Sequence, residues 1–446
     1  MSRARQMHLN AFLMGVGHHE AAWRLPGSDP LANTDVAHYQ WLGQVAERGK
    51  LDSVFFADSP SLMTSPARRP SESLEPTLLL AAIAAVTDRI GLIATASTTY
   101  DEPFNLARRF ASLDHLSNGR AGWNSVTTAA ADAAANFGYD AIPSHSARYA
   151  RAEEFIDVVQ ALWDSWSEDA VLADKDAGVY AQTDLVRTID HVGEHFRVRG
   201  PLNVSRSPQG RPVIVQAGSS GPGTALAARY AEAVFTAQQT LEEAQRFYRD
   251  LKHQVDLAGR NPDHVKILPG IVPLVGSTEA EARRIEEELD GLMVHEHALR
   301  QLAEAIGVPM AELDLDRPLP DLVRNVDEIE ENKSRYTLTV DLARRESLTV
   351  RQLLNRLGGG RGHRTFAGTP EQVADTLEQW FTHGAADGFN VMPAAMPSGL
   401  EAFVDHVVPI LQSRGLFRTE YTGSTLRGHY GLDVPTAGDR ALRDAV

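Results

Sequence analysis

Short apolar runs alternate along the chain with longer segments whose apolar residues recur every three or four positions. The first pattern is typical of buried β-strands, and the second is typical of amphipathic helices. Eight apolar runs qualify as strands: His8–Met14, Leu51–Ala57, Ile90–Ala94, Gly119–Thr128, Pro212–Gln216, Ala233–Thr236, Val265–Val275 and Gly388–Pro393. Because helical segments separate them, we expect parallel strands joined by helical crossovers.

Helical patterns fill most of the connections. They cover Asp35–Lys50, Glu75–Asp88, Pro103–Leu116, Leu241–Ala258, Thr369–His383 and Leu400–Gln412. Right-handed strand–helix–strand units repeated around a sheet close it on itself, so the pattern predicts an α/β fold, a (β/α)8 TIM barrel. An open, doubly wound sheet is the alternative fold.

Two long stretches interrupt the alternation. One covers about 129–211 after the fourth strand, and the other covers about 293–363 after the seventh strand and is charged, without strand patterning. The second ends in Gly358–Gly360, which we interpret as a hinge. Residues from about 415 to 446 form a C-terminal extension. We expect one barrel domain over 1–446, with both insertions closing over the carboxyl ends of the strands.

The composition narrows the classes of function. The formal net charge is -16 at pH 7, which argues against a nucleic-acid surface because phosphate binding relies on clustered Lys and Arg. The chain has no cysteine, which excludes disulfides, thiolate metal sites, iron–sulfur clusters and cysteine nucleophiles. No apolar run approaches the ~20 residues of a membrane-spanning helix, and the N-terminus lacks the apolar segment of a secretory signal. We therefore expect a cytoplasmic protein without membrane or nucleic-acid partners.

Polar residues stand where the predicted strands end, which is where barrels bind their ligands. They are His18, His19, Asp58, Thr95, Ser97, Asn124, Thr127, Gln216, Ser219 and Ser220. The fifth strand leads into the small-residue turn Gly218–Gly223 and then into a helix. Unpaired amides at a helix start, with two hydroxyls beside them, suit a phosphate or another anion. An ordinary strand–helix turn rich in glycine is the alternative.

Several longer stretches carry a family resemblance. They are Asn10–Phe12, His18–Arg24, Asp52–Asp58, Gly119–Thr128, His145–Glu153, Val213–Phe235, Gly368–Trp380 and Arg414–Leu432. With them the chain resembles the nitrilotriacetate monooxygenase component A family, within the bacterial-luciferase-like flavin monooxygenases. The resemblance implies a barrel that binds reduced FMN, reacts it with O2 to a C4a-hydroperoxide, and oxygenates a small organic substrate such as an aminopolycarboxylate or a sulfone.

The resemblance also implies partners. A separate NAD(P)H-dependent flavin reductase usually supplies the reduced flavin in this two-component family, and barrels of this group form homodimers or homotetramers. One observation fits this division independently, because no Gly-x-Gly-x-x-Gly follows a predicted strand. The nearest candidate, Gly358–Gly362, lies in an insertion.

The cofactor-binding candidates fall into three groups. Gly218, Ser219 and Ser220 are predicted to hold the FMN phosphate. Asp58, Thr95 and Asn124, at strand ends, are predicted to hydrogen-bond the flavin ring or its ribityl chain. His145 and Tyr149 lie four apart at a helix start and face the same way; in resembling proteins this pair lies beside the flavin. Capping or core packing is the alternative reading for each residue outside the phosphate loop.

His18 and His19 are the catalytic candidates. An imidazole that follows the first strand is suited to hold substrate or to control a proton during oxygen transfer. Adjacent residues of an extended chain point in opposite directions, so we expect only one of the two to face the pocket. Arg24, Arg361 and Arg364 are candidate donors for a substrate carboxylate.

Three other functions remain as alternatives. A deazaflavin-dependent oxidoreductase shares this barrel group, and a non-catalytic flavin-binding relative would share its sequence pattern. A metal-dependent barrel hydrolase commonly needs His-x-His after the first strand, whereas this chain has His18-His19-Glu20. His295 and His297, two apart on a helix, would diverge. We therefore predict no metal site.

Overall fold

The computed structural model describes residues 5–62, 66–218, 220–320, 333–360 and 362–437. Eight parallel strands form a closed ring, in which β1 pairs with both β2 and β13, and β10 pairs with both β9 and β11. In ring order they are β1 (His8–Phe12), β2 (Ser53–Phe56), β3 (Gly91–Ser97), β4 (Ala121–Val126), β9 (Val213–Ala217), β10 (Ala233–Thr236), β11 (Lys266–Val275) and β13 (Gly388–Val391). The predicted (β/α)8 barrel is confirmed.

Side chains alternate along each strand between the barrel interior and the surrounding helices. The inward side chains form one apolar cluster, which includes Phe12, Phe55, Val215 and Phe235. Their outward neighbours belong to a larger cluster shared with the helices. Burial on both faces explains why the strands read as continuous apolar runs rather than as alternating patterns.

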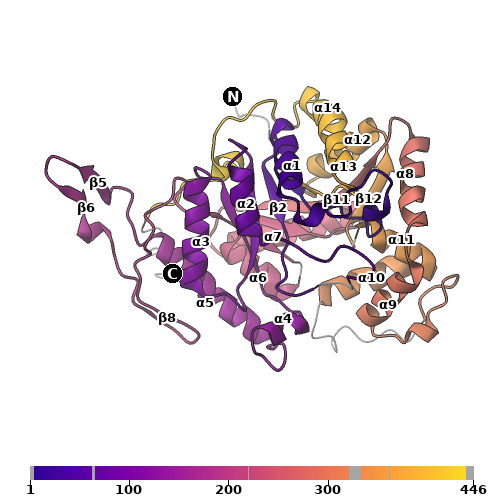
Figure 1. Ribbon diagram of the computed structural model, residues 1–446, viewed down its shortest axis with the longest axis horizontal. Helices are drawn as coiled ribbons and strands as arrows, with labels where there is room; N and C mark the ends of the chain where they lie inside the picture. Colours follow the sequence, from indigo (N-terminus) through magenta and orange to yellow (C-terminus); the bar gives the residue numbers. More distant parts are fainter. Residues whose placement is uncertain (1–4, 63–65, 219, 321–332, 361, 438–446) are drawn as a thin grey trace.

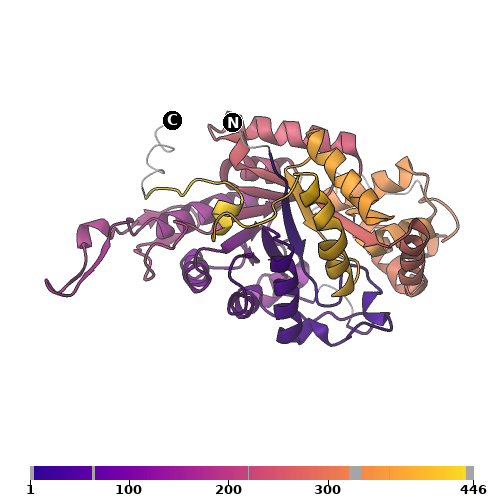
Figure 2. The ribbon, with the colours of Figure 1, turned by 90° about the horizontal axis from the view of Figure 1, so that it is seen from above.

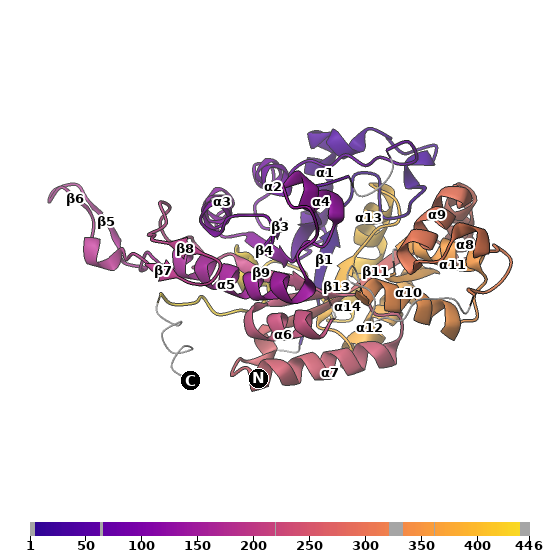
Figure 3. The ribbon, with the colours of Figure 1, turned by 90° about the horizontal axis from the view of Figure 1, so that it is seen from below.

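Figure 3 shows the helices arranged around the strands. They are α1 (Val36–Arg48), α2 (Pro76–Ala84), α3 (Pro103–Leu116), α6 (Gly221–Tyr230), α7 (Leu241–Leu257), α12 (Pro370–Thr382), α13 (Ser398–Ala402) and α14 (Val408–Ser413). A π-helical turn joins α13 to α14. Local signals fix several starts, because Thr240 and Thr369 each form a capping box with the third residue of the helix that follows.

The first insertion projects from one end of the molecule. It contains α4 (Ala131–Asn136), α5 (His145–Trp163) and two small hairpins, β5 (Val171–Asp174) with β6 (Val179–Ala181), and β7 (His191–Val192) with β8 (Arg197–Val198). Figures 1 and 2 show the β5–β6 hairpin extending away from the body. Helix α5 packs between α3 and α6, so the insertion is anchored on the barrel helices.

The second insertion lies at the opposite end in Figure 1. After α8 (Glu279–Gly291) it contains α9 (His295–Ile306), α10 (Lys333–Arg345) and α11 (Val350–Gly360), which share an apolar cluster of their own. The predicted hinge at Gly358–Gly360 is wrong, because these residues are the buried end of α11. A Cβ atom on Gly358 would lie 2.7 Å from Met293 Sδ, so that glycine allows close packing.

The sheet of the barrel has a ninth strand, β12 (Arg364–Gly368), which follows α11 and was not predicted from the sequence pattern. It pairs with Ile271–Val275 of β11, outside the closed ring. Apart from glycine, its only apolar residues are Phe366 and Ala367, which are adjacent, so the segment shows no alternation of apolar and polar residues. The pairing places the end of the second insertion beside the carboxyl half of β11.

The C-terminal extension closes the amino-terminal end of the barrel. Helix α15 (Leu426–His429) places Leu426 against Gly91 and Gly122, where added Cβ atoms would lie 2.5 and 3.0 Å from its methyl groups. Tyr430 Oη donates to Asn10 Oδ1 at 2.9 Å inside the barrel. The open end is therefore the carboxyl end of the strands. None of the helices in the described ranges is long and apolar enough to cross a membrane.

Candidate active site

Two predicted residues, Thr95 and Asn124, face each other at the carboxyl end of the barrel. They are register partners on β3 and β4, and Asn124 Nδ2 donates to Thr95 Oγ1 at 2.8 Å. Both side chains are buried, and Asn124 Oδ1 has no hydrogen-bond partner in the part of the chain that the structure describes. A buried acceptor without a partner costs free energy, so the pair is suited to receive a donor from a bound ligand.

The turn after β9 has the features expected of a phosphate loop. Gly218 has φ of 131°, and a Cβ atom there would meet nothing within 4 Å. Ser220 caps α6, since its Oγ accepts from the Gly223 amide at 3.3 Å. Ser219 lies outside the described residues. Open backbone beside a capped helix N-terminus fits the phosphate of FMN.

The start of α5 meets this loop. Tyr149 Oη lies 3.5 Å from Ser220 Oγ, and a Cβ atom on Gly223 would lie 3.2 Å from the same phenol oxygen. His145 packs against Tyr149 with ring centroids 4.7 Å apart. Their spacing of four residues places both on one face of α5, as predicted. The first insertion therefore brings two predicted residues to the loop after β9.

Asp58 follows β2 and is half-buried. Burial raises the pKa of its carboxyl group to about 6, with further contributions from the nearby Glu75 and Asp101 carboxylates. Arg109, which pairs with Asp101 at 3.4 Å, acts in the opposite direction. The side chain therefore changes charge near neutral pH, which an ordinary surface aspartate does not.

The two adjacent histidines diverge. His18 is fully buried, its Nε2 donates to the Phe12 carbonyl at 2.8 Å, and its ring lies edge-on to the Phe12 ring at 4.6 Å. His19 turns toward α8, where its Nε2 lies 3.3 Å from Asp290 Oδ1. Its Nδ1 accepts from the Ala21 amide at 3.1 Å, which places the ring proton on Nε2. Of the two, His18 is the one in contact with the barrel interior.

Three phenylalanines form an aromatic floor at the barrel mouth, defined here as Phe12, Phe55 and Phe235. The Phe12 ring lies 4.6 Å from Phe55 and 5.6 Å from Phe235, both edge-on. The Gly218 amide donates to the Phe235 carbonyl at 3.2 Å, so the floor adjoins the predicted phosphate loop. The sequence did not reveal this group, because each member reads as an ordinary core residue of its own strand.

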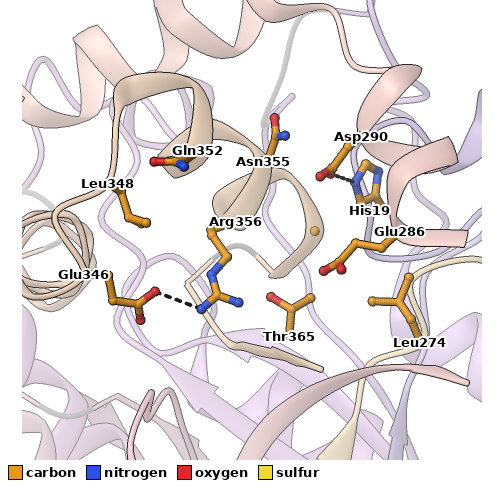
Figure 4. A pocket seen from close by; sticks show the side chains of 11 residues that line it. His19, Leu274, Glu286, Asp290, Glu346, Leu348, Gln352, Asn355, Arg356 and Thr365 are labelled. Atoms are coloured by element: carbon orange, nitrogen blue, oxygen red, sulfur yellow. Dashed lines mark hydrogen bonds and ion pairs between the residues drawn. The ribbon is translucent and has the colours of Figure 1, made fainter. Parts of the chain in front are cut away.

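A cavity of about 330 Å³ opens beside His19, between the second insertion and the barrel. Arg356 of α11 donates to Glu346 at 3.0 Å, and Figure 4 shows that Arg356 and Glu286 of α8 reach toward the same space. Burial, and then the neighbouring Asp290 carboxylate, raise the pKa of Glu286. The cavity therefore offers a guanidinium and carboxylates to a polar ligand. Neither Arg356 nor Glu286 had been predicted, since the insertion gave no motif and the charges of α8 read as a solvated helix face.

The arginines predicted as carboxylate donors are differently placed. Arg24 is exposed and donates to the Leu292 carbonyl. Arg364 donates to the Gln239 carbonyl at 2.9 Å and lies over the Trp380 ring at 5.6 Å. Arg361 falls outside the described residues. Arg356, rather than Arg24 or Arg364, is the guanidinium that lines the cavity beside His19.

His297 lies 4.0 Å from Glu20, and this contact involves only two side chains. Throughout the described ranges, no group of three or more histidine, aspartate or glutamate side chains is arranged to hold a metal ion. The polar groups at the barrel mouth are instead mainly hydroxyls, amides and imidazoles, together with the Asp58 carboxyl group. This donor set suits an organic cofactor with a phosphate group.

Comparison with known proteins agrees with this geometry. Residues 18–387 match the family model described as luciferase-like monooxygenase. The chain is 49% identical over 448 residues to nitrilotriacetate monooxygenase component A of Aminobacter aminovorans, with 98% of each chain covered. It is 48% identical over 435 residues to N-acetyl-S-(2-succino)cysteine monooxygenase of Bacillus subtilis, covering 97% of this chain and 98% of the relative. The solved EDTA monooxygenase of Chelativorans sp. BNC1 superposes with a TM-score of 0.79 at 38% identity, covering 97% of this chain and 100% of that chain. The chain belongs to the luciferase-like monooxygenase family.

Proposed function

We propose that this chain is the oxygenase of a two-component flavin-dependent monooxygenase that binds reduced FMN and a small organic substrate at the barrel mouth. Reduced FMN supplies two electrons to O2, so that one oxygen atom enters the substrate and the other leaves as water. The observation that carries the proposal is the turn after β9, where Gly218 leaves open space and Ser220 caps a helix. A phosphate binds such a turn without a lysine or arginine.

The other predicted residues are proposed to hold the rest of the cofactor. Tyr149 and His145 would lie beside the phosphate end, because Tyr149 contacts Ser220. Thr95 and Asn124 would hydrogen-bond the flavin through the Asn124 carbonyl oxygen, which has no partner in the described part of the chain. Asp58 would accept a hydrogen bond from the flavin imide as a carboxylate.

His18 is proposed as the proton-handling group. Its Nε2 proton is held by the Phe12 carbonyl, so Nδ1 is the basic nitrogen of the neutral ring. A buried imidazole beside the aromatic floor is positioned to take or give a proton where oxygen transfer occurs. His19 is proposed to act differently, by joining the loop after β1 to α8 through Asp290.

The substrate is proposed to carry charged groups, as an aminopolycarboxylate does, with a sulfone or related compound as the wider class. Two relatives with nearly half their residues identical are named for nitrilotriacetate and N-acetyl-S-(2-succino)cysteine. The cavity beside His19 supports this class, because Arg356 offers a guanidinium to a carboxylate. The relative named as component A supports a separate second component, which we propose to be an NAD(P)H-dependent flavin reductase.

Anaerobic titration with reduced FMN, followed by an O2 pulse, tests this function. We expect saturable binding of reduced FMN, and product from nitrilotriacetate or N-acetyl-S-(2-succino)cysteine that carries one labelled oxygen when 18O2 is supplied. A parallel titration with a reduced deazaflavin should show weaker binding. Tight binding of the deazaflavin, or product without oxygen from O2, would reject the monooxygenase assignment.

Replacement of Ser220 by alanine tests the phosphate loop. The hydroxyl contributes a hydrogen bond to a charged group, so we expect the Kd for reduced FMN to rise by an amount equivalent to about 1–3 kcal/mol. Thr224→Val is the matched control, since Thr224 donates to the Gly221 carbonyl in the same turn. Ser220→Ala also removes a helix cap, so its melting temperature is measured to account for the lost stability. An unchanged Kd for reduced FMN in this variant would show that the phosphate binds elsewhere.

The raised pKa of Asp58 predicts that binding of reduced FMN depends on pH. Since the pKa of Asp58 is raised to about 6, the carboxylate that accepts from the flavin forms only above that pH. The affinity for reduced FMN should therefore increase about tenfold as pH rises through 6, as expected for a charge-assisted hydrogen bond. Asp58→Asn should abolish this increase, whereas Asp132→Asn, at an exposed carboxylate of α4, should retain it. A persistent increase in Asp58→Asn would assign the titration to another group.

A further inference from the structure

His363 enters the barrel from the second insertion. It directly precedes β12, and its neighbour Arg364 pairs with Ile271 of β11. Beside it, Gly270 leaves the inner face of β11 without a side chain, and a Cβ atom there would lie 2.4 Å from His363 Nδ1. The same Cβ atom would lie 2.8 Å from the Phe235 ring, which shows that a side chain at position 270 would point into the barrel. The imidazole therefore occupies the space that a side chain at position 270 would fill.

His363 extends the aromatic floor. Its ring stacks on Phe235 with a centroid distance of 4.8 Å and an interplanar angle of 10°. Phe235 contacts Phe12, and Phe12 contacts His18, so the two histidines flank one group of rings. His363 is 9% exposed and His18 is 0% exposed. His363 is therefore a second buried histidine beside the aromatic floor, on the side opposite His18.

We propose that His363 is a positioning and specificity-determining residue of the oxygenation site, a wall that narrows the barrel mouth and excludes water from it. This inference rests on the proposed function. The stacked ring packs on the Phe235 ring, which in turn lies edge-on to Phe12, so His363 bounds the aromatic floor on one side. A site that keeps water out suppresses release of hydrogen peroxide as a side reaction and restricts which substrates fit.

The first test removes the ring. His363→Ala should release hydrogen peroxide at least fivefold faster than the wild type when reduced FMN and O2 react without substrate. Its KM ratio between nitrilotriacetate and dibenzothiophene sulfone should change at least tenfold, while the Kd for reduced FMN stays within twofold. His363→Phe, which retains a stacking ring, should restore peroxide release to within threefold of the wild type. His429→Ala is the matched control, because His429 is an equally buried histidine at the closed end of the barrel.

The second test displaces the ring without changing it. Gly270→Ala places a methyl group 2.4 Å from His363 Nδ1, so it should increase peroxide release as His363→Ala does. Adding Gly270→Ala to His363→Ala should raise the release by a smaller factor than Gly270→Ala causes alone, since the His363 ring is gone and only the contacts with Phe235 and Met392 remain. This non-additivity is expected only if both substitutions act on the same wall.

The outcomes separate this inference from the proposed function. A wild-type enzyme that binds no reduced FMN, or whose product carries no oxygen from O2, would reject the function and the inference together. A wild-type enzyme that transfers oxygen, with peroxide release in His363→Ala equal to that of His429→Ala, would overturn the role of His363 alone. The role of His363 would also be overturned if His363→Phe released hydrogen peroxide as fast as His363→Ala does, because the wall would then not depend on an aromatic ring at this position.

Discussion

Replacing His18 by glutamine is expected to lower kcat for oxygenation by about 100- to 10,000-fold, the range for losing a positioned proton-transfer group. Glutamine can keep a hydrogen bond to the Phe12 carbonyl, which His18 Nε2 makes at 2.8 Å, but it cannot take up the proton. The Kd for reduced FMN should change little, since the phosphate loop lies on β9 and α6. The loss should therefore appear in kcat rather than in cofactor binding.

The measurement compares His18→Gln with His19→Gln under saturating reduced FMN. His19 faces Asp290 of α8, outside the barrel interior, so its replacement should cost less than tenfold in kcat. The pH profile is the second readout, because a lost imidazole removes one limb that the wild type shows. Equal losses in the two variants would show that the histidines act together, contrary to their observed divergence.

Replacing Asp52 by asparagine is expected to destabilise the protein by about 3–5 kcal/mol, the cost of removing one partner of a buried ion pair. Asp52 is fully buried at the amino-terminal end of the barrel. Its carboxylate accepts from the Leu9 amide at 2.7 Å, lies 3.0 Å from His8 Nδ1 and pairs with Arg418 of the C-terminal extension. Asparagine would leave the Arg418 charge buried without its counter-ion.

The lowered pKa of Asp52 also predicts that the free energy of unfolding decreases at acid pH. Burial alone would raise the pKa of Asp52, but Arg418 and then His8 outweigh it and lower the pKa from 3.8 to about 2. A carboxyl group with a lowered pKa stabilises the folded state above its unfolded pKa and loses that contribution as pH falls toward its folded pKa. About 1 kcal/mol of the Asp52 contribution should therefore be lost between pH 5 and pH 3.

Urea denaturation at pH 7, 5 and 3 measures both effects as free energies of unfolding. The difference between wild type and Asp52→Asn should shrink at pH 3. Arg418→Met in combination with Asp52→Asn should recover part of the loss, because the double variant buries no unpaired charge. A pH-independent difference between the wild type and Asp52→Asn would contradict the lowered pKa.

Local signals explain why so much of the fold could be predicted. The predicted and observed starts of α3 coincide at Pro103, and α12 begins beside its capping residue Thr369. Capping and apolar periodicity act within one or two turns of chain, so they can be read from neighbouring residues. The turn Gly218–Gly223 is equally local, which is why Gly218 and Ser220 could be proposed as phosphate-binding candidates from the sequence, while the capping role of Ser220 appeared only in the structure.

The strand β12 and the end of α11 show where such reading fails. Arg364–Gly368 forms a strand only because its backbone pairs with Ile271–Val275 of β11. Gly358 packs closely against Met293, which lies far away in the sequence. In both cases the deciding neighbour comes from another part of the chain, and a local pattern carries no information about it.

For the candidate site, the order of residues along the chain was enough to predict which polar residues stand at the strand ends, because a parallel barrel gathers those ends at one face. The folded structure alone set the direction of each side chain. It turned His18 toward the aromatic floor and His19 toward Asp290, and it placed Arg356 in the cavity. It also brought His363 over Gly270, across 92 intervening positions, since van der Waals contact depends on distance in space and not along the chain.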